Sequence, residues 1–428
     1  MSHTPLGICT RAWLVAGAMI ALTATTNQAL ADGEWPRWRG PNSTGAVVDR
    51  PAPIHFSEPE QFAWQIDLPG QGASTPVVHG DALVLTCTAA EQDTVVCYGL
   101  DGKLRWQKAL GPARAGKHRE GSGAAPSAVT DGERIVVYFK SGTLAAFDWQ
   151  GNKLWQTNLQ QEYGPDTLWW DLGTSPALAD GKVIVAVMQD GPSFLVARDV
   201  ATGDEVWKTD RTYKRPRESD QAYTTPTVCE VDGVQTIVTW GADHLTGHDL
   251  QSGELLWQCG GFNPAEQGMW RVIASQTVAD GMAVVPYGRG NFVAGIRLGG
   301  HGDTTETARV WEKEGFGSDV PTPAAAKGRA YVLGDDGQLT CLDIATGEIA
   351  WEHKLPRSRN RFYSSPTLVD DVLYCARIDG TVFVGRVSDA QFELLATNEL
   401  DDQMVAAPAP TAAGLLLRGG SKLWLVRE

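Results

Sequence analysis

The sequence predicts an all-β protein, an eight-bladed β-propeller of four-stranded antiparallel blades. Three observations predict it: a recurring proline, a recurring tryptophan, and paired apolar runs separated by turns. The proline follows small or hydroxylated residues at Pro76, Pro126, Pro176, Pro226, Pro323, Pro366 and Pro408. Gln276 stands at the equivalent place between the fourth and fifth, which makes eight copies.

The tryptophans recur at about the same spacing as the prolines. Its members are Trp64, Trp106, Trp155, Trp207, Trp257, Trp311 and Trp351, with Leu394 in the eighth place. A tryptophan buries a large area and its indole N–H can donate to a neighbouring backbone carbonyl. We therefore interpret these residues as wedges between blades and not as a cofactor cage.

Each copy contains four short strands, which we call A to D. Strand A follows the proline, glycine-containing turns lead to B and C, and an Asp/Gly turn leads to D with its tryptophan. In the sixth copy B and C are "RAYVL" and "QLTCLDI", separated by "GDDG". Strands alternating with Gly, Asp and Asn turns are typical of antiparallel hairpins.

The two ends of the chain complete one blade. The last copy stops after its third strand at "LWLVRE", and "FAWQIDL" supplies a D strand before the first proline. Pairing these segments closes the ring and leaves no sheet edge unpaired. We predict three parts: a signal peptide at 1–31, a lead segment at 32–62 and the propeller at 63–428.

The first residues have the pattern of an export signal. Arg11 precedes an apolar run from Ala12 to about Ala24, and Ala29-Leu30-Ala31 offers an A-x-A cleavage site. The run is too short for a membrane-spanning helix. We expect a periplasmic or secreted monomer, without a membrane span, cleaved near Ala31.

The net charge and the number of cysteines narrow the class of protein further. The formal net charge is −15, and loss of residues 1–31 removes only Arg11, giving −16. Such an acidic chain argues against nucleic acid as a partner. Six cysteines follow the signal peptide, too few for a dense disulfide framework. Cys87 and Cys97 flank a predicted hairpin, and their pairing is left open.

At this point the repeat resembles a known family. The pattern D-x-x-[ST]-G-x-x-x-W in "DVATGDEVW", "DLQSGELLW" and "DIATGEIAW" is similar to the repeat of pyrroloquinoline-quinone (PQQ)-type eight-bladed propellers. The segment "EWPRWRGPNSTG" resembles the N-terminal lead of secreted bacterial members. Because the repeat itself is structural, the resemblance indicates the fold and leaves the activity open.

Two branches of this superfamily carry different functions. The resemblance to quinoprotein alcohol dehydrogenases implies PQQ and Ca²⁺ at the propeller centre, with an Asp base and a disulfide of adjacent cysteines. This chain has no adjacent cysteines. The resemblance to BamB, the propeller lipoprotein of outer-membrane barrel assembly, implies loop contacts with partner proteins. This chain lacks that protein's lipidated cysteine.

The connections between strand D and the next strand A are the candidate contact region, since function on a propeller is carried by loops on a rigid frame. D–A connections and B–C turns share one face. The connections after Trp106, Trp155, Trp207 and Trp257 are long, whereas those after Trp64 and Trp311 are short. Blades 2 to 5 therefore supply most of the predicted surface.

Aromatic, basic and acidic residues are mixed in these long connections. Such a mixture suits a sugar, a planar group or an anion. The alternative is that Trp169 and Trp170 only pack the long loops. The candidate ligand-binding residues are Trp169, Trp170, Asp171, Arg215, Arg217, Glu218, Asp220, His244, Trp270, Arg271 and Arg289.

Three basic clusters, "RAGKHRE", "YKRPRE" and "RSRNR", also fall in D–A connections. They indicate a face that meets an anionic partner, with ordinary solvated loops as the alternative. His244 and His248 lie on a predicted strand about 13 Å apart, too far to share one metal ion. We predict no metal site and leave catalytic residues unassigned.

We interpret the protein as an exported, non-catalytic binding or scaffold propeller that needs no cofactor. Its long-loop face would contact a partner protein or an anionic or glycan ligand. The first alternative is a PQQ- and Ca²⁺-dependent oxidoreductase. The second is a carbohydrate-binding or carbohydrate-active propeller, for which Glu218 and Asp220 would be the carboxylate pair.

Overall fold

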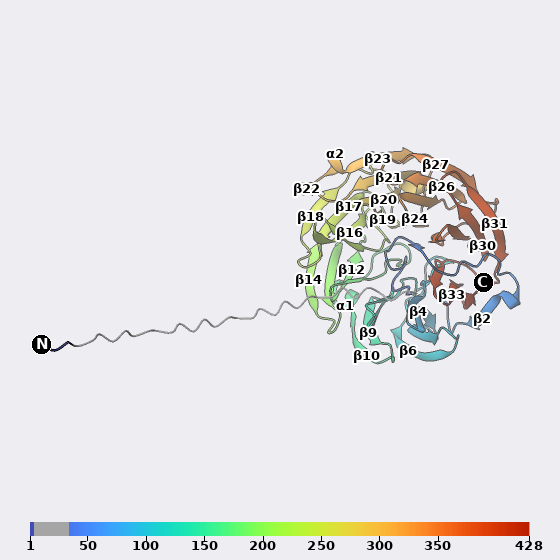
Figure 1. The fold of residues 1–428 in the computed structure, drawn as a ribbon, viewed down its shortest axis with the longest axis horizontal. Helices are drawn as coiled ribbons and strands as arrows, with labels where there is room; N and C mark the ends of the chain where they lie inside the picture. Colours follow the sequence, from blue (N-terminus) through green and yellow to red (C-terminus); the bar gives the residue numbers. More distant parts are fainter. Residues whose placement is uncertain (4–33, 428) are drawn as a thin grey trace. The chain divides into compact units, whose positions relative to one another are not determined.

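A computed structural model describes residues 1–3 and 34–427, so the predicted signal peptide lies almost entirely outside the described residues. Contacts divide the chain into Met1–Leu30 and Ala31–Glu428, and the following concerns the second unit. Within residues 34–427 there are eight β-sheets arranged as a ring (Figure 1). The predicted eight-bladed propeller is confirmed. No helix of the described part is long and apolar enough to cross a membrane.

The first four blades follow in chain order, each starting with a short inner strand A. Their strands are β3 (Val77–His79), β4 (Ala82–Ala89), β5 (Gln92–Gly99), β6 (Leu104–Pro112); β7 (Val129–Thr130), β8 (Arg134–Tyr138), β9 (Thr143–Asp148), β10 (Lys153–Asn158); β11 (Ala177–Ala179), β12 (Lys182–Val187), β13 (Phe194–Asp199), β14 (Glu205–Asp210); and β15 (Thr227–Val231), β16 (Val234–Gly241), β17 (His244–Asp249), β18 (Leu255–Cys259).

The other four blades repeat the pattern, and the last takes a strand from the N-terminal region. Their strands are β19 (Thr277–Ala279), β20 (Met282–Tyr287), β21 (Phe292–Arg297), β23 (Arg309–Glu314); β24 (Ala324–Ala326), β25 (Arg329–Leu333), β26 (Gln338–Asp343), β27 (Ile349–Lys354); β28 (Thr367–Val369), β29 (Val372–Ala376), β30 (Thr381–Val387), β31 (Phe392–Glu399); and β32 (Ala409–Thr411), β33 (Gly414–Arg418), β34 (Lys422–Val426), β2 (Phe62–Asp67).

Ring closure occurs where the sequence predicts it. β2 pairs antiparallel with β34, with Gln65 opposite Trp424. Since β2 is the outer strand of the blade that β32 to β34 begin, residues from both ends of the second unit form one sheet.

Two sheets depart from the predicted four strands. β22 (Gly302–Asp303) adds a parallel fifth strand outside β18, and β1 (Ala46–Val47) adds one inside β28. Helices α1 (Leu159–Tyr163) and α2 (Thr305–Ala308) lie in connections, with 3-10 turns at Pro59–Gln61 and Gly288–Gly290. The sequence shows no periodicity for elements this short.

Hydroxyl groups beside the prolines link the inner strands. The backbone N–H of one blade donates to the hydroxyl of the next blade, with N–O distances of 2.9–3.0 Å, in the series Thr75 to Ser127 to Ser175 to Thr225 to Ser275 to Thr322 to Ser365. Hydroxylated residues therefore precede Pro176, Pro226, Pro323 and Pro366 because they carry the acceptors that join neighbouring blades, whereas in blade 2 the acceptor Ser127 follows Pro126. Ala407 holds the corresponding place in blade 8 and has no side-chain hydroxyl.

The tryptophans of strand D join the blades farther out. In six blades the indole N–H donates to a carbonyl of the next blade, as Trp155 does to Val200 at 2.8 Å. Gly203 lies directly against the Trp155 ring, where an added Cβ would come within 2.6 Å of it. The predicted packing role of these tryptophans is confirmed.

Replacing Trp155 with phenylalanine is expected to reduce the free energy of unfolding by about 1–2 kcal/mol, because the buried carbonyl of Val200 loses its donor. Trp257 is the matched control. Its indole N–H is buried and donates to no described residue, so Trp257→Phe is expected to cost less. Urea denaturation of both variants checks this, and equal losses would contradict it.

The lead segment crosses the centre of the ring, as the blue trace shows (Figure 1). Its backbone pairs with inner strands of blades 1 and 2 through Trp35 and Pro36, and of blades 6 and 7 through Thr44 and Gly45. These contacts lie beside the A–B turns, opposite the D–A connections. The segment therefore lies across the A–B face of the ring and contacts four blades there.

Arg39 anchors this segment. It is 1% exposed, and its guanidinium donates to the carbonyls of Pro323 at 3.0 Å and Pro366 at 2.7 Å. Burial lowers the pKa of Arg39 to about 9, so the group remains charged at neutral pH. One side chain thus joins blades 6 and 7 to the lead segment.

The six cysteines of the described region are free. Cys87 lies opposite Thr94, and Cys97 lies opposite Val84, so the two cysteines do not face each other. The pairing that the sequence left open is not formed, because the β4–β5 register separates them. Burial raises the pKa of Cys87 to about 11 and of Cys97 to about 12, which keeps both thiols protonated.

Candidate ligand-binding cavity

A cavity of about 1000 Å³ opens at the D–A face. Its lining comes from the D–A connections before blades 2, 3, 5, 6, 7 and 8, together with B–C turns of blades 5 and 6. The ring of His118 lies 5.9 Å from that of Trp170 and 6.4 Å from that of Tyr363. The connection after β6 therefore reaches across the face to the connection before β28.

Four of the eleven predicted residues line this cavity: Trp170, Asp171, Arg271 and Arg289. Trp170 is 39% exposed, and its indole N–H donates to Glu218 at 2.8 Å. The backbone N–H of Trp170 donates to the Tyr223 hydroxyl. These bonds hold the indole in place at the cavity wall.

The carboxylate of Asp171 is bound by groups of the protein itself. Its carboxylate accepts the N–H groups of Lys117 and His118 and forms an ion pair with Lys140, whose side chain is completely buried. The Lys140 ammonium also donates to the carbonyl of Ala115. Asp171 thus ties the connection after β6 to the frame, and its charge is balanced.

Glu218 lies behind the wall and begins a row of alternating charges. Its side chain is fully buried, 3.3 Å from Nε of Arg271. Arg271 reaches Asp319 at 3.2 Å, and Asp319 is 3.4 Å from Arg289. The row ends at Arg289, whose side chain is 44% exposed. Two arginines and two carboxylates compensate each other, which fixes the guanidinium planes at the cavity edge.

Three other predicted residues pack among the loops outside the cavity lining. The Arg217 guanidinium lies 4.7 Å above the ring of Trp169, a cation–π contact. Trp270 packs edge-on against Tyr287 and does not line the cavity. Its backbone N–H donates to the Ser219 hydroxyl. These residues support the loops that carry Trp170 and Arg271.

Arg215, Asp220 and His244 also lie outside the cavity lining. Arg215 pairs with Asp243 at 3.6 Å, and burial raises the pKa of Asp220 to about 6. His244 stacks on Tyr213 with ring centres 3.8 Å apart, and burial lowers its pKa to about 4. His244 and His248 lie on β17, as predicted.

The acidic residues that line the cavity were not predicted from the sequence. Asp319 comes from the short connection after Trp311, and Asp335 from a B–C turn whose "GDDG" pattern indicates only a turn. Arg361 and His118 belong to clusters that were singled out for charge alone, and Tyr363 shows no sequence signal. Loop length is thus a poor guide, because a short loop next to the axis still reaches the cavity.

Asp335 is the most perturbed carboxyl of this side. Its Oδ1 accepts the N–H groups of Asp319 at 2.9 Å and Val320 at 3.2 Å. Burial, followed by repulsion from the Asp319 carboxylate, raises the pKa of Asp335 to about 6. The group therefore changes its charge near pH 6.

Replacing Asp335 with asparagine tests this shift. A raised carboxyl pKa stabilises the fold most below the unfolded value near 3.8, and this stability is lost as the pH rises through about 6. The stability of the wild type relative to Asp335→Asn should therefore fall by roughly 2–3 kcal/mol between pH 3.5 and pH 7. Chemical denaturation at both pH values measures it, and a constant difference would contradict it.

The donor set does not fit a quinone–calcium centre. Across residues 1–3 and 34–427, no three His, Cys, Asp or Glu side chains gather into a group able to hold a metal ion. Asp171 and Asp319 are engaged by Lys140 and by two arginines. Because calcium requires several oxygen ligands, we derive no reaction step from PQQ and Ca²⁺.

One comparison with known proteins shows a family. The family described as outer membrane protein assembly factor BamB matches residues 41–217, 140–301 and 302–391. These ranges cover most of the chain, which therefore belongs to this family. A comparison with curated protein sequences returned no match.

Solved structures show the same fold at low identity. BamB from Moraxella catarrhalis matches with a TM-score of 0.60 and 17% identity, covering 85% of this chain and 99% of its own. A europium-containing methanol dehydrogenase matches with 0.72 and 11%, covering 92% and 98%. Quinohemoprotein alcohol dehydrogenase from Comamonas testosteroni gives 0.67 and 12%, covering 92% and 80%. The fold is thus both BamB-like and quinoprotein-dehydrogenase-like.

Proposed function

We propose that the protein is an exported, non-catalytic binding or scaffold module that contacts a ligand or a partner protein through its D–A face. The observation that carries this proposal is the wide cavity at that face, combined with the lead segment across the channel at the opposite face. The family, that of an outer membrane protein assembly factor, supports a partner-binding role. We propose a monomer in the periplasm or outside the cell.

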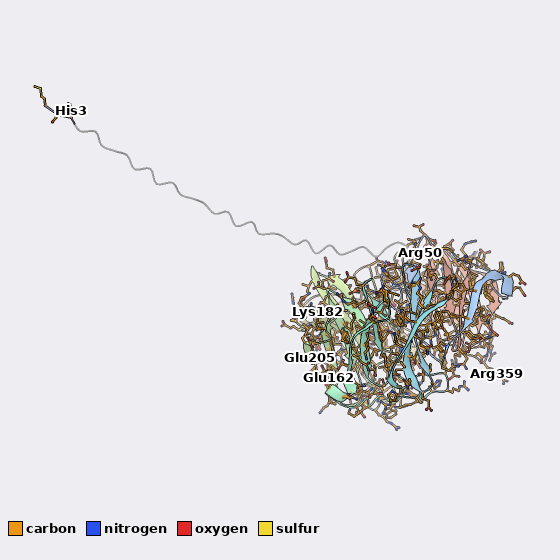
Figure 2. All side chains as sticks on the ribbon, turned by 90° about the horizontal axis from the view of Figure 1, so that it is seen from below. His3, Arg50, Glu162, Lys182, Glu205 and Arg359 are labelled. Carbon is orange, nitrogen blue, oxygen red and sulfur yellow. The ribbon has the colours of Figure 1, made fainter. Side chains whose placement is uncertain are left out.

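The surroundings of the cavity favour contact with an acidic partner. Arg114 and Arg119 of the first basic cluster are paired with Asp166 and Glu120. Lys214, Arg357 and Arg359 are exposed cations, and no described residue pairs with them. Exposed, uncompensated cations accelerate encounter with an acidic surface and give it an orientation. Arg359 and Arg50 project on opposite sides of the ring (Figure 2).

Site-specific photocrosslinking in the cells that make the protein tests whether the D–A face contacts a partner. A crosslinking residue at Lys214 or Arg357 reports on the D–A connections, and one at Glu133 reports on an A–B turn. We expect discrete crosslinked products from the first two positions and none from Glu133. Products from Glu133 alone, or from no position, would overturn the proposal.

The oxidoreductase alternative needs a separate measurement. The purified mature protein is incubated with PQQ and Ca²⁺, and dye reduction is followed over a panel of alcohols. We expect no turnover above the protein-free control. Sustained turnover would defeat the non-catalytic proposal, whichever face the crosslinks report.

A further inference from the structure

We propose that the cavity binds an acidic oligosaccharide, with a sugar ring against Trp170 and a uronate carboxylate at Arg361. This inference rests on the proposed function, because it names the ligand class of the same cavity. It comes from three properties of the lining: exposed aromatic rings, one uncompensated guanidinium, and carboxylates beside it.

The aromatic side chains provide apolar faces for sugar rings. Trp170 is 39% exposed although its indole N–H is bonded to buried Glu218, so the ring stays open to the cavity while its position is fixed. His118 lies edge-on between Trp170 and Tyr363. Large aromatic side chains with fixed orientation bind ligands at a low cost in conformational entropy. The row of rings suits two or more consecutive sugar units.

Arg361 is the cation available to a ligand. Arg271 and Arg289 share the Asp319 carboxylate, and Arg271 also contacts Glu218. Arg361 lines the same cavity, is exposed, and forms no ion pair with any described residue. A guanidinium presents parallel N–H groups that match a carboxylate. A ligand carboxylate would pair with the Arg361 guanidinium there.

Acceptors beside Arg361 favour a ligand rich in hydroxyl groups. Asp335, Asp336 and Glu352 line the cavity, and Asp336 alone of these is paired, with Lys354 at 2.6 Å. Carboxylates accept hydrogen bonds from hydroxyl groups, and they repel a doubly charged phosphate more strongly than a singly charged carboxylate. A uronic-acid saccharide supplies both the hydroxyl donors and one carboxylate per acidic unit, whereas a polyphosphate supplies only negative charge.

Calorimetry on the mature protein tests the inference with tetrasaccharides of galacturonate, of mannuronate, and of alternating glucuronate and N-acetylglucosamine. Cellotetraose is the neutral probe. We expect at least one acidic tetrasaccharide to bind at millimolar concentration or better, and at least about tenfold more tightly than cellotetraose. Absence of binding by all three, or equal binding of cellotetraose, overturns the inference.

Variants assign the binding to this cavity. Arg361→Gln and Trp170→Ala are each expected to weaken acidic tetrasaccharide binding about tenfold or more. Arg297→Gln removes an exposed cation at the end of β21, outside the lining, and should leave binding unchanged. Trp170→Phe keeps a ring without the bond to Glu218 and should retain most of the affinity. Equal weakening by Arg297→Gln and Arg361→Gln would overturn the inference.

The two proposals fail separately. Crosslinks at Lys214 or Arg357 without saccharide binding would retain the binding face and reject the ligand class. Near-ultraviolet circular dichroism of each variant identifies any loss of fold.

Discussion

Replacing Arg39 with alanine is expected to lower the free energy of unfolding by about 3–5 kcal/mol. The substitution removes two hydrogen bonds that join the lead segment to Pro323 and Pro366, and it leaves both carbonyls in a dry interior. It also leaves a cavity where the side chain was. An effect of this size is rare for one residue and is typical of a lost buried network.

Urea denaturation of Arg39→Ala and Arg50→Ala measures the effect against a control from the same segment. Arg50 is only partly buried and donates to the carbonyl of its neighbour Asp49, so its loss should change stability by less than about 0.5 kcal/mol. Arg39→Lys retains the charge but offers no guanidinium fork, and an intermediate loss is expected. Similar stabilities of the Arg39 and Arg50 variants would show that the lead segment does not anchor the ring.

Replacing Asp171 with alanine should cost about 3–5 kcal/mol, because it leaves the Lys140 ammonium buried without its counter-ion. The N–H groups of Lys117 and His118 lose their acceptor as well. The cavity wall formed by the connection after β6 is expected to loosen together with the fold.

A second variant separates the charge from the packing. In Lys140→Met with Asp171→Leu both charges are absent, and stability should recover part of the loss, since apolar residues can replace a buried ion pair. The exposed pair of Lys103 and Asp101, 3.0 Å apart, gives the control, and Asp101→Ala should cost less than about 1 kcal/mol. Thermal and urea unfolding of the four proteins measure these values. A double variant less stable than Asp171→Ala would contradict the account.

The repeat predicts the frame because each copy repeats the same local physics. Pro176 belongs to one series of equivalent residues in successive copies, and Trp155 belongs to another. One repeated pattern therefore gives strand order, blade number and ring closure. The repeat does not predict the contacts of the lead segment, since Trp35 pairs once, with Val78, and Arg39 donates to carbonyls hundreds of residues away. Sequence periodicity carries no information about contacts that are made only once.

The cavity was less accessible to prediction for a related reason. Trp170 and Arg271 stand out as unusual residues in long loops, and the structure brings both to the cavity wall. His244 has equally suggestive chemistry but stacks on Tyr213 inside the loops. Asp335 was not predicted because a B–C turn of two glycines and two aspartates has an adequate local explanation. Distance from the axis decides which of these residues faces a ligand, and a sequence does not state it.

Pairing of β2 with β34 has a consequence for biosynthesis. The strand at residues 62–67 cannot pair with its neighbouring strand until residues 422–426 have been synthesised. Nascent intermediates consequently expose a β-edge for most of translation, a hazard for aggregation. Chaperone demand should therefore be greatest just before the last strand emerges.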